Sequence, residues 1–147
     1  MREILLATDG SKHSLRAAET AGVISSALRA RVNVINVVSD ARVTAGPIDE
    51  YARAEQIAIT QRDLLQSLGA EFVNESADIV RKAGGVVGST RVLIGSPARE
   101  IVGYANDNDV DCIVMGRRGL GDAAGLLMGS VSHKVGHLTE RTLITTE

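Results

Sequence analysis

Five short apolar runs alternate with segments of helical periodicity along this chain of 147 residues, and this alternation restricts the fold more than any other feature. The runs span residues 4–7, 32–38, 86–94, 112–115 and 143–145. Most of them are continuously apolar, which is typical of strands covered on both faces. The order predicts an α/β fold: one open, mostly parallel five-stranded sheet of Rossmann-like type, with helices on both faces and right-handed crossovers.

Four helical segments lie between the runs, and the second is long, covering about residues 49–82. Ser96 is the expected N-cap of the third helix, with Pro97 at its first position, and the fourth is expected to begin near Ser130. The apolar residues at helical spacing are Ala17, Ala21, Ile24 and Leu28 in the first segment, Leu65, Leu68, Phe72 and Ile79 in the second, and Val131, Val135 and Leu138 in the fourth. Residues 39–47 form the one loop expected to be mobile.

Length and composition set further limits. A chain of this length predicts one domain, residues 1–147. With no Trp, one Phe and two Tyr, it lacks the stacking platforms of single-stranded nucleic-acid binders, and a net charge of −2 without a basic block argues against duplex binding. No apolar stretch is long enough to cross a membrane, and Asp9 ends the first apolar run too early for a signal peptide. Cys112, alone and within an apolar run, is expected to be buried, which fits a cytoplasmic protein.

The most unusual stretch is GRRGLGDAAGLLMGSVS, residues 116–132, which holds five of the 15 glycines. It follows the fourth strand and precedes the last helix, so it lies at the carboxyl edge of the sheet, where such folds bind ligands. Glycines allow close backbone approach, and exposed N–H groups together with a helix N-terminus favour an anion. Ser130 adds a hydroxyl, and Arg117 and Arg118 add positive charge. A polyphosphate site is predicted.

Two other interpretations of this stretch stay open on the residues alone. The glycines fit a flexible connection with a helix cap about equally well. Residues 119–124 also match G-x-G-x-x-A, a dinucleotide fingerprint, although such fingerprints belong to the first strand–helix turn of a βαβ unit. No G-x-x-x-x-G-K-[ST] sequence occurs, so an ordinary P-loop NTPase is excluded.

The spacing of these glycines resembles that of a known family. Gly116, two residues, Gly119, nine residues and then Gly129-Ser130 match the G-2x-G-9x-G-[S/T] pattern of the nucleotide-binding universal stress proteins. The similarity covers the whole chain, including the opening ILLATDGSKHS and the segment VLIGSPAREIVGYANDNDVDCIVMGRRG. It implies an adenine nucleotide α-hydrolase-like fold and an ATP-binding protein of the stress response.

The resemblance also implies individual roles. Asp9 would lie near the ribose and phosphates and help to hold Mg²⁺, and Val37 would offer its backbone to the adenine. From the residues alone, a helix N-cap or a turn aspartate beside Gly10 is the favoured interpretation of Asp9, and with the resemblance we expect it to serve both roles. The residues implied in ATP binding are Ala7, Thr8, Asp9, Val37, Met115, Gly116, Arg118, Gly119, Gly129, Ser130, Val131 and Ser132.

The chain departs from the family in two places. The loop interior GDAAG carries an acid and two alanines where many members have basic residues, which shifts the expected phosphate contacts to Arg117, Arg118 and backbone donors. The C-terminal segment ERTLITTE lacks the Pro-Val pair that starts the last strand of many members. That strand is still expected to form a homodimer through its exposed edge.

Histidines are the remaining candidates for chemistry. His133 and His137 are four residues apart and could hold a metal on one helix face, but the H-E-x-x-H arrangement is absent and a solvated face is the expectation. His13 could reach a phosphate, with ordinary surface placement as the alternative. We find no nucleophile with a plausible base and orienting group.

Three functions follow for comparison. The first is an ATP-binding regulatory protein that acts on an unknown protein partner. The second is a weak ATPase or self-phosphorylating enzyme, and the third is a nucleotide-free dimerisation module.

Overall fold

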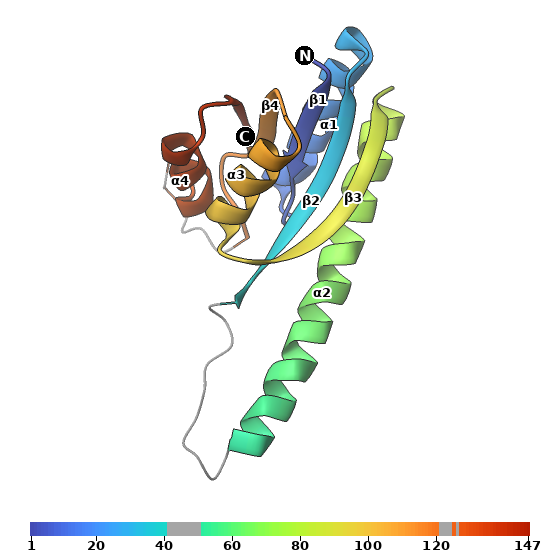
Figure 1. The fold of residues 1–147 in the computed structure, drawn as a ribbon. Coiled ribbons are helices and arrows are strands. Elements are labelled where there is room, and N and C mark those ends of the chain that lie inside the picture. The colour runs from blue at the N-terminus through green and yellow to red at the C-terminus, as the bar shows by residue number, and fades with distance from the viewer. Residues whose placement is uncertain (41–50, 121–124, 126) are drawn as a thin grey trace.

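The computed structural model of the chain describes residues 1–40, 51–120, 125 and 127–147, without the side chains of 51–60. It contains five strands and four helices in strict alternation (Figure 1). The elements are β1 (Glu3–Ala7), α1 (Lys12–Leu28), β2 (Arg31–Ser39), α2 (Tyr51–Lys82), β3 (Val86–Gly95), α3 (Pro97–Asp107), β4 (Cys112–Gly116), α4 (Ser130–Leu138) and β5 (Thr142–Thr146). The expected loop at 39–47 lies outside the described residues beyond Asp40.

All strand pairings in the sheet are parallel, in the order β3-β2-β1-β4-β5. The predicted α/β fold class is confirmed. The pairing of β3 with β2 shifts register at Gly88, opposite Val32 and Asn33. A Cβ atom at residue 88 would lie 2.9 Å from Asn33 Oδ1, so any other residue there would require the Asn33 side chain to shift.

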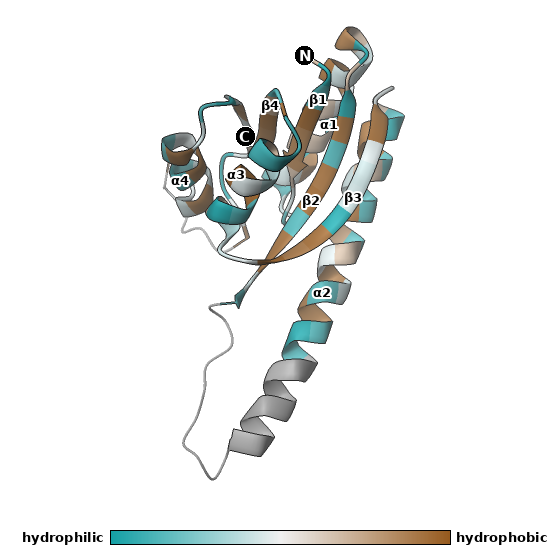
Figure 2. Ribbon diagram, viewed as in Figure 1, coloured by the Kyte–Doolittle hydropathy of each residue, from teal (hydrophilic) through white to brown (hydrophobic). Residues whose placement is uncertain are grey.

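The sheet separates two apolar cores, because successive side chains of a strand point to opposite faces. Ile4 and Leu6 of β1 pack with α1 and α2, whereas Leu5 and Ala7 pack with α3 and α4. Figure 2 shows the hydrophobic central strands between these layers. Cys112 is buried in the first core, and burial raises the pKa of its thiol, so the side chain is an inert apolar group as predicted.

Helix ends follow local sequence in most places, with one correction. Gly84, with a φ of 85°, ends α2 in the left-handed conformation, and the Gly85 N–H closes the turn on the Val80 carbonyl at 2.9 Å. Ser96 occupies the N-cap position of α3 as predicted, but its side chain makes no capping hydrogen bond. Pro97, which has no N–H to satisfy, starts that helix instead. None of the helices in the described ranges has the length and hydropathy to cross a membrane.

Candidate functional site

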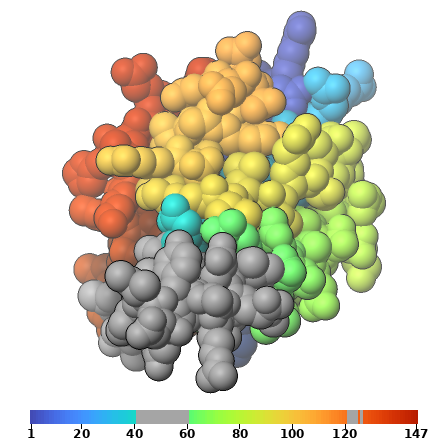
Figure 3. Space-filling model, turned by 60° about the horizontal axis from the view of Figure 1, so that its bottom comes forward, coloured from blue at the N-terminus to red at the C-terminus, as the bar shows by residue number. Residues whose placement is uncertain are grey.

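A cavity of about 410 Å³ opens at the carboxyl ends of the strands. The ends of β1 and β4 form its floor. These two strands are neighbours at the centre of the sheet, with β2 and β3 on the β1 side and β5 on the β4 side. The chain therefore reverses its winding direction between β1 and β4, which is where open parallel sheets bind ligands. Figure 3 views this edge, with the end of β2 (cyan) reaching the surface between α3 (yellow) and α2 (green).

All twelve residues expected to bind a nucleotide line this one cavity, although they come from four separate parts of the chain. They are Ala7, Thr8, Asp9, Val37, Met115, Gly116, Arg118, Gly119, Gly129, Ser130, Val131 and Ser132. The structure thus brings together the segments that the resemblance picked out. Among the described lining residues, Asp9 and Arg118 are the only charged side chains.

The turn after β1 satisfies its own backbone donors. Asp9 Oδ1 accepts a hydrogen bond from the Ser11 N–H at 3.0 Å, and Ser11 Oγ accepts from the Ser14 N–H at 3.2 Å. Ser11, rather than Asp9, is therefore the N-cap of α1. Asp9 Oδ2 accepts from the Leu120 N–H at 3.0 Å, so this carboxylate ties the glycine-rich segment to β1.

The start of α4 is arranged in the opposite way. Its N-cap is Gly129, in an extended conformation with φ −72° and ψ 159°, and no side chain of the described residues caps the helix. The first hydrogen bond into the helix runs from His133 N–H to the Gly129 carbonyl at 3.0 Å. The N–H groups of Ser130, Val131 and Ser132 precede it, at the open end of the helix, beside the cavity.

The Ser132 hydroxyl does not cap the first N–H groups of α4, because it bonds to carbonyl oxygens. It lies 2.6 Å from the Arg117 carbonyl and 3.1 Å from the Gly129 carbonyl. The Gly129 N–H also donates to the Arg117 carbonyl, at 2.7 Å. Both ends of the glycine-rich segment are therefore pinned together, which holds the open end of α4 in place.

Gly116 has a structural reason for lacking a side chain. A Cβ atom at this position would lie 2.8 Å from the Ser14 amide nitrogen and 2.9 Å from the His13 carbonyl carbon. Backbone atoms cannot yield as a flexible side chain does, so glycine lets α1 pack against the end of β4. The first glycine of the spaced motif thus serves packing between elements, in addition to lining the cavity.

The two arginines of the motif separate. Arg118 lines the cavity, whereas Arg117 is absent from its described lining and forms an ion pair with Glu147. The Arg117 N–H donates to the Thr146 carbonyl at 2.7 Å. Arg117 is therefore held beside β5 and not at the cavity, and its expected phosphate contact stays a prediction.

Buried hydroxyl groups fix the floor of the cavity. Ser76 Oγ of α2 lies 2.8 Å from Thr8 Oγ1, which lies 3.2 Å from Ser14 Oγ of α1. Asn36 Nδ2 donates to the Thr8 carbonyl at 2.8 Å. These four side chains are buried, so their hydrogen bonds join two helices and two strands at the base of Asp9.

The rest of the cavity lining, which is largely apolar, was not predicted from the sequence. The additional lining residues are Ser14, Ile35, Asn36, Val38, Ser39, Leu65, Leu68, Phe72, Pro97, Ile101 and Leu120. From the sequence, Leu65, Leu68 and Phe72 form an apolar stripe along a helix, and helical spacing alone does not distinguish a core face from a cavity wall. Phe72 also lies against Gly10, where a Cβ atom would approach its ring to 2.4 Å.

His13 is not among the described lining residues. It is half-buried beside Gly116, and its carbonyl accepts a hydrogen bond from Thr146 Oγ1 at 2.8 Å. His133 and His137 are exposed on α4, as expected for a solvated face.

Comparison with known proteins supports the resemblance. A sequence model of the universal stress protein family matches residues 1–144. The universal stress protein YxiE of Bacillus subtilis (strain 168) is 30% identical over 138 residues, covering 93% of each chain.

Solved structures share the fold. The structure of the hypothetical protein MJ0577 superposes with a TM-score of 0.82 at 21% identity, covering 99% of this chain and 94% of that one. A universal stress protein in complex with cAMP (TM-score 0.66, 24% identity, 99% and 96% covered) and one from Archaeoglobus fulgidus in complex with dAMP (0.65, 20%, 100% and 98%) are also similar.

Proposed function

Because the chain belongs to the universal stress protein family, we propose that it binds an adenine nucleotide in the cavity at the carboxyl edge, with ATP as the ligand. The observation that carries the proposal is the open N-terminus of α4 beside a cavity of ligand size. Helix N–H groups without a capping side chain, at the positive end of the helix dipole, bind phosphate groups.

Two parts of the cavity lining suit the two ends of a nucleotide. The α4 side offers the backbone of Gly129, the exposed Ser130 and the Arg118 side chain. Much of the remaining lining is apolar, with Val37, Leu65 and Ile101 among its residues. We place the phosphates on the α4 side and the base against the apolar lining, where the backbone of Val37 would meet the adenine.

Mg²⁺ fits the site only if phosphate oxygens of the bound nucleotide supply part of its coordination. It binds through one or two carboxylates together with phosphate oxygens and water, and Asp9 is the one carboxylate among the described lining residues. Asp9 already accepts two backbone hydrogen bonds, so its free lone pairs could complete but not build a magnesium site.

Isothermal titration of ATP, ADP, AMP and cAMP, each with and without Mg²⁺, tests the proposal. ATP is expected to bind, and Gly129→Val is expected to abolish binding, because a side chain at this buried N-cap blocks approach to the helix amides. Gly103→Ala is the matched control: residue 103 lies in α3 with open space around it. Equal ATP affinity of Gly129→Val and Gly103→Ala would contradict the proposal.

As a regulatory protein, the chain would signal the presence of ATP through a change in the surface that its partner contacts. The expected ordering of residues 116–130 by ATP falls partly on residues outside the described ranges; we propose that bound ATP alters a surface beside the cavity that a protein partner in the cytoplasm recognises. Native mass spectrometry of the protein as purified separates this from a nucleotide-free module, which would carry no nucleotide. Phosphate release above that of a Gly119/Gly129 double variant would identify hydrolysis instead.

We also propose a homodimer through β5. In the part of the chain that the structure describes, this strand pairs with β4 alone and forms one edge of the sheet, so its outer backbone groups are available to a second copy. A monomeric mass by light scattering at high protein concentration would contradict the dimer without affecting the nucleotide site.

A further inference from the structure

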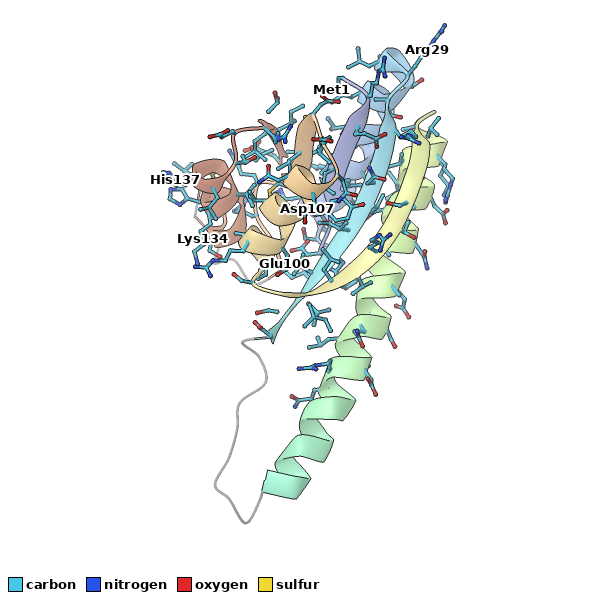
Figure 4. The ribbon with its side chains drawn as sticks, viewed as in Figure 1. Met1, Arg29, Glu100, Asp107, Lys134 and His137 are labelled. Atoms are coloured by element: carbon cyan, nitrogen blue, oxygen red, sulfur yellow. The ribbon has the colours of Figure 1, made fainter. Side chains whose placement is uncertain are left out.

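Two histidine side chains converge on the outer surface of α4. His133 and His137 lie one helical turn apart, and their Nε2 atoms are 3.3 Å from each other. The ring centroids are 4.5 Å apart and the ring planes are inclined by 73°. Both residues are exposed, and Figure 4 shows His137 projecting outward from the helix, away from the sheet.

This separation matches that of two ligands on one metal ion. Imidazole nitrogens bind Zn²⁺ at about 2.0–2.1 Å in tetrahedral geometry, which places two such nitrogens about 3.3–3.4 Å apart. The side chains already hold this spacing, so a metal ion could replace the shared proton between the two Nε2 atoms. Each ring would then carry its proton on Nδ1 and donate the Nε2 lone pair.

The position of His137 within the helix favours a cation. His137 lies in the last turn of α4, where the negative end of the helix dipole stabilises positive charge. Lys134, also exposed, opposes this effect from the neighbouring turn. The amino end of α4 therefore faces the cavity, and its carboxyl end carries His137.

We propose that His133 and His137 bind one divalent transition-metal ion of the class that prefers imidazole, such as Zn²⁺. Within the described residues, no group of three or more His, Cys, Asp or Glu side chains is placed to hold a metal. Water completes the coordination, so the site is open and one ion binds per chain. This site is separate from the proposed nucleotide cavity and does not depend on it.

Titration of the full, nucleotide-free chain with Zn²⁺ tests the assignment. The matched control is His13→Ala, because His13 is the third and last histidine of the chain. The His13→Ala variant is expected to bind one Zn²⁺ with unchanged affinity. His133→Ala and His137→Ala are each expected to weaken binding by roughly tenfold or more, since the second ligand is then no longer held beside the first.

A spectroscopic measurement identifies the ligand atoms. On addition of one equivalent of Zn²⁺, the ¹⁵N signals of Nε2 in both His133 and His137 are expected to shift, while those of His13 stay in place. Thermal unfolding of each variant checks that the exposed substitutions leave the fold intact. Equal affinity of His137→Ala and the unmodified chain, binding lost in His13→Ala, or one ion shared by two chains would each overturn the proposal.

Discussion

Two helices begin at the carboxyl edge of the same sheet, and they treat their first N–H groups differently. At α1, Ser11 Oγ accepts the Ser14 N–H and Asp9 accepts the Ser11 N–H. At α4, Gly129 supplies no side chain, and the hydroxyl of Ser132 bonds to carbonyl oxygens instead. The first helix start is closed by its own residues and the second is left open.

The difference shows how residues that stabilise a helix start can be told apart from residues that leave it open to a ligand. Serine, glycine and aspartate occur near both helix starts, so residue type alone does not tell them apart. What distinguishes them is which atoms the hydroxyl and carboxyl groups contact. A closed start contributes stability, whereas an open start beside a cavity leaves donors for a ligand.

The largest effect is expected from a substitution that caps the open N-terminus of α4. Gly129→Asp would place a carboxylate at the N-cap, where it accepts the helix N–H groups and repels phosphates. We expect ATP affinity to fall about a hundredfold, close to 2.8 kcal/mol, while the free energy of unfolding changes by only a few tenths of a kcal/mol. Calorimetric titration and urea unfolding measure the two quantities.

Gly129→Ser is the control for that substitution, because it caps the helix without adding charge. Its ATP affinity should lie between those of the unmodified chain and Gly129→Asp. Undiminished affinity in both variants would show that the helix amides are not the phosphate site.

Gly116 tests the packing side of the same motif. Gly116→Ala would push a methyl group against the backbone of His13 and Ser14, with contacts of 2.8–2.9 Å. We expect destabilisation of about 1–3 kcal/mol, as for other overpacked sites, and a melting temperature lower by about 2–4 °C per kcal/mol. Thermal unfolding measures this shift. A melting temperature equal to that of the unmodified chain would mean that α1 moves aside freely.

Ser11 tests the closed start. Ser11→Ala removes the cap of α1 and should lower the free energy of unfolding by about 1 kcal/mol. ATP affinity should stay the same, because these donors face the chain itself. Chemical unfolding and ATP titration of the same variant give both values, and a loss of affinity without a loss of stability would reverse the assignment of the two helix starts.

Much of this arrangement follows from the sequence. The alternation of apolar runs with helical periodicity predicted the parallel sheet, and the spaced glycines predicted the edge at which the cavity opens. Leu65, Leu68 and Phe72 were not predicted as cavity wall, because helical spacing records a shared face and not what the face meets. The close approach of α1 to Gly116 and the pairing of Arg117 with Glu147 depend on elements far apart in the chain, which local patterns do not describe.

A further contact between a carboxylate and backbone N–H groups lies at the amino edge of the sheet, in open solvent. We expect it to contribute little to the free energy of unfolding. Asp111 Oδ2 accepts hydrogen bonds from the Arg2 N–H at 2.6 Å and the Glu3 N–H at 3.0 Å, and these bonds hold the pKa of the Asp111 carboxyl below its ordinary value. Since the folded-state pKa is the lower one, the stabilisation is complete above the unfolded-state pKa of about 3.9 and is lost as pH falls through the folded-state value. Asp111→Asn keeps an acceptor but loses the charge, so at about pH 6 it should reduce the free energy of unfolding by less than about 1 kcal/mol, because the exposed carboxylate is screened.

Urea unfolding from about pH 6 down to about pH 2 should show this difference vanishing once Asp111 is protonated in both states. A difference that persists unchanged at the lowest pH would mean that the side chain acts through its shape and not its charge, and the distinction between charged closure and neutral capping at the helix starts would lose this support.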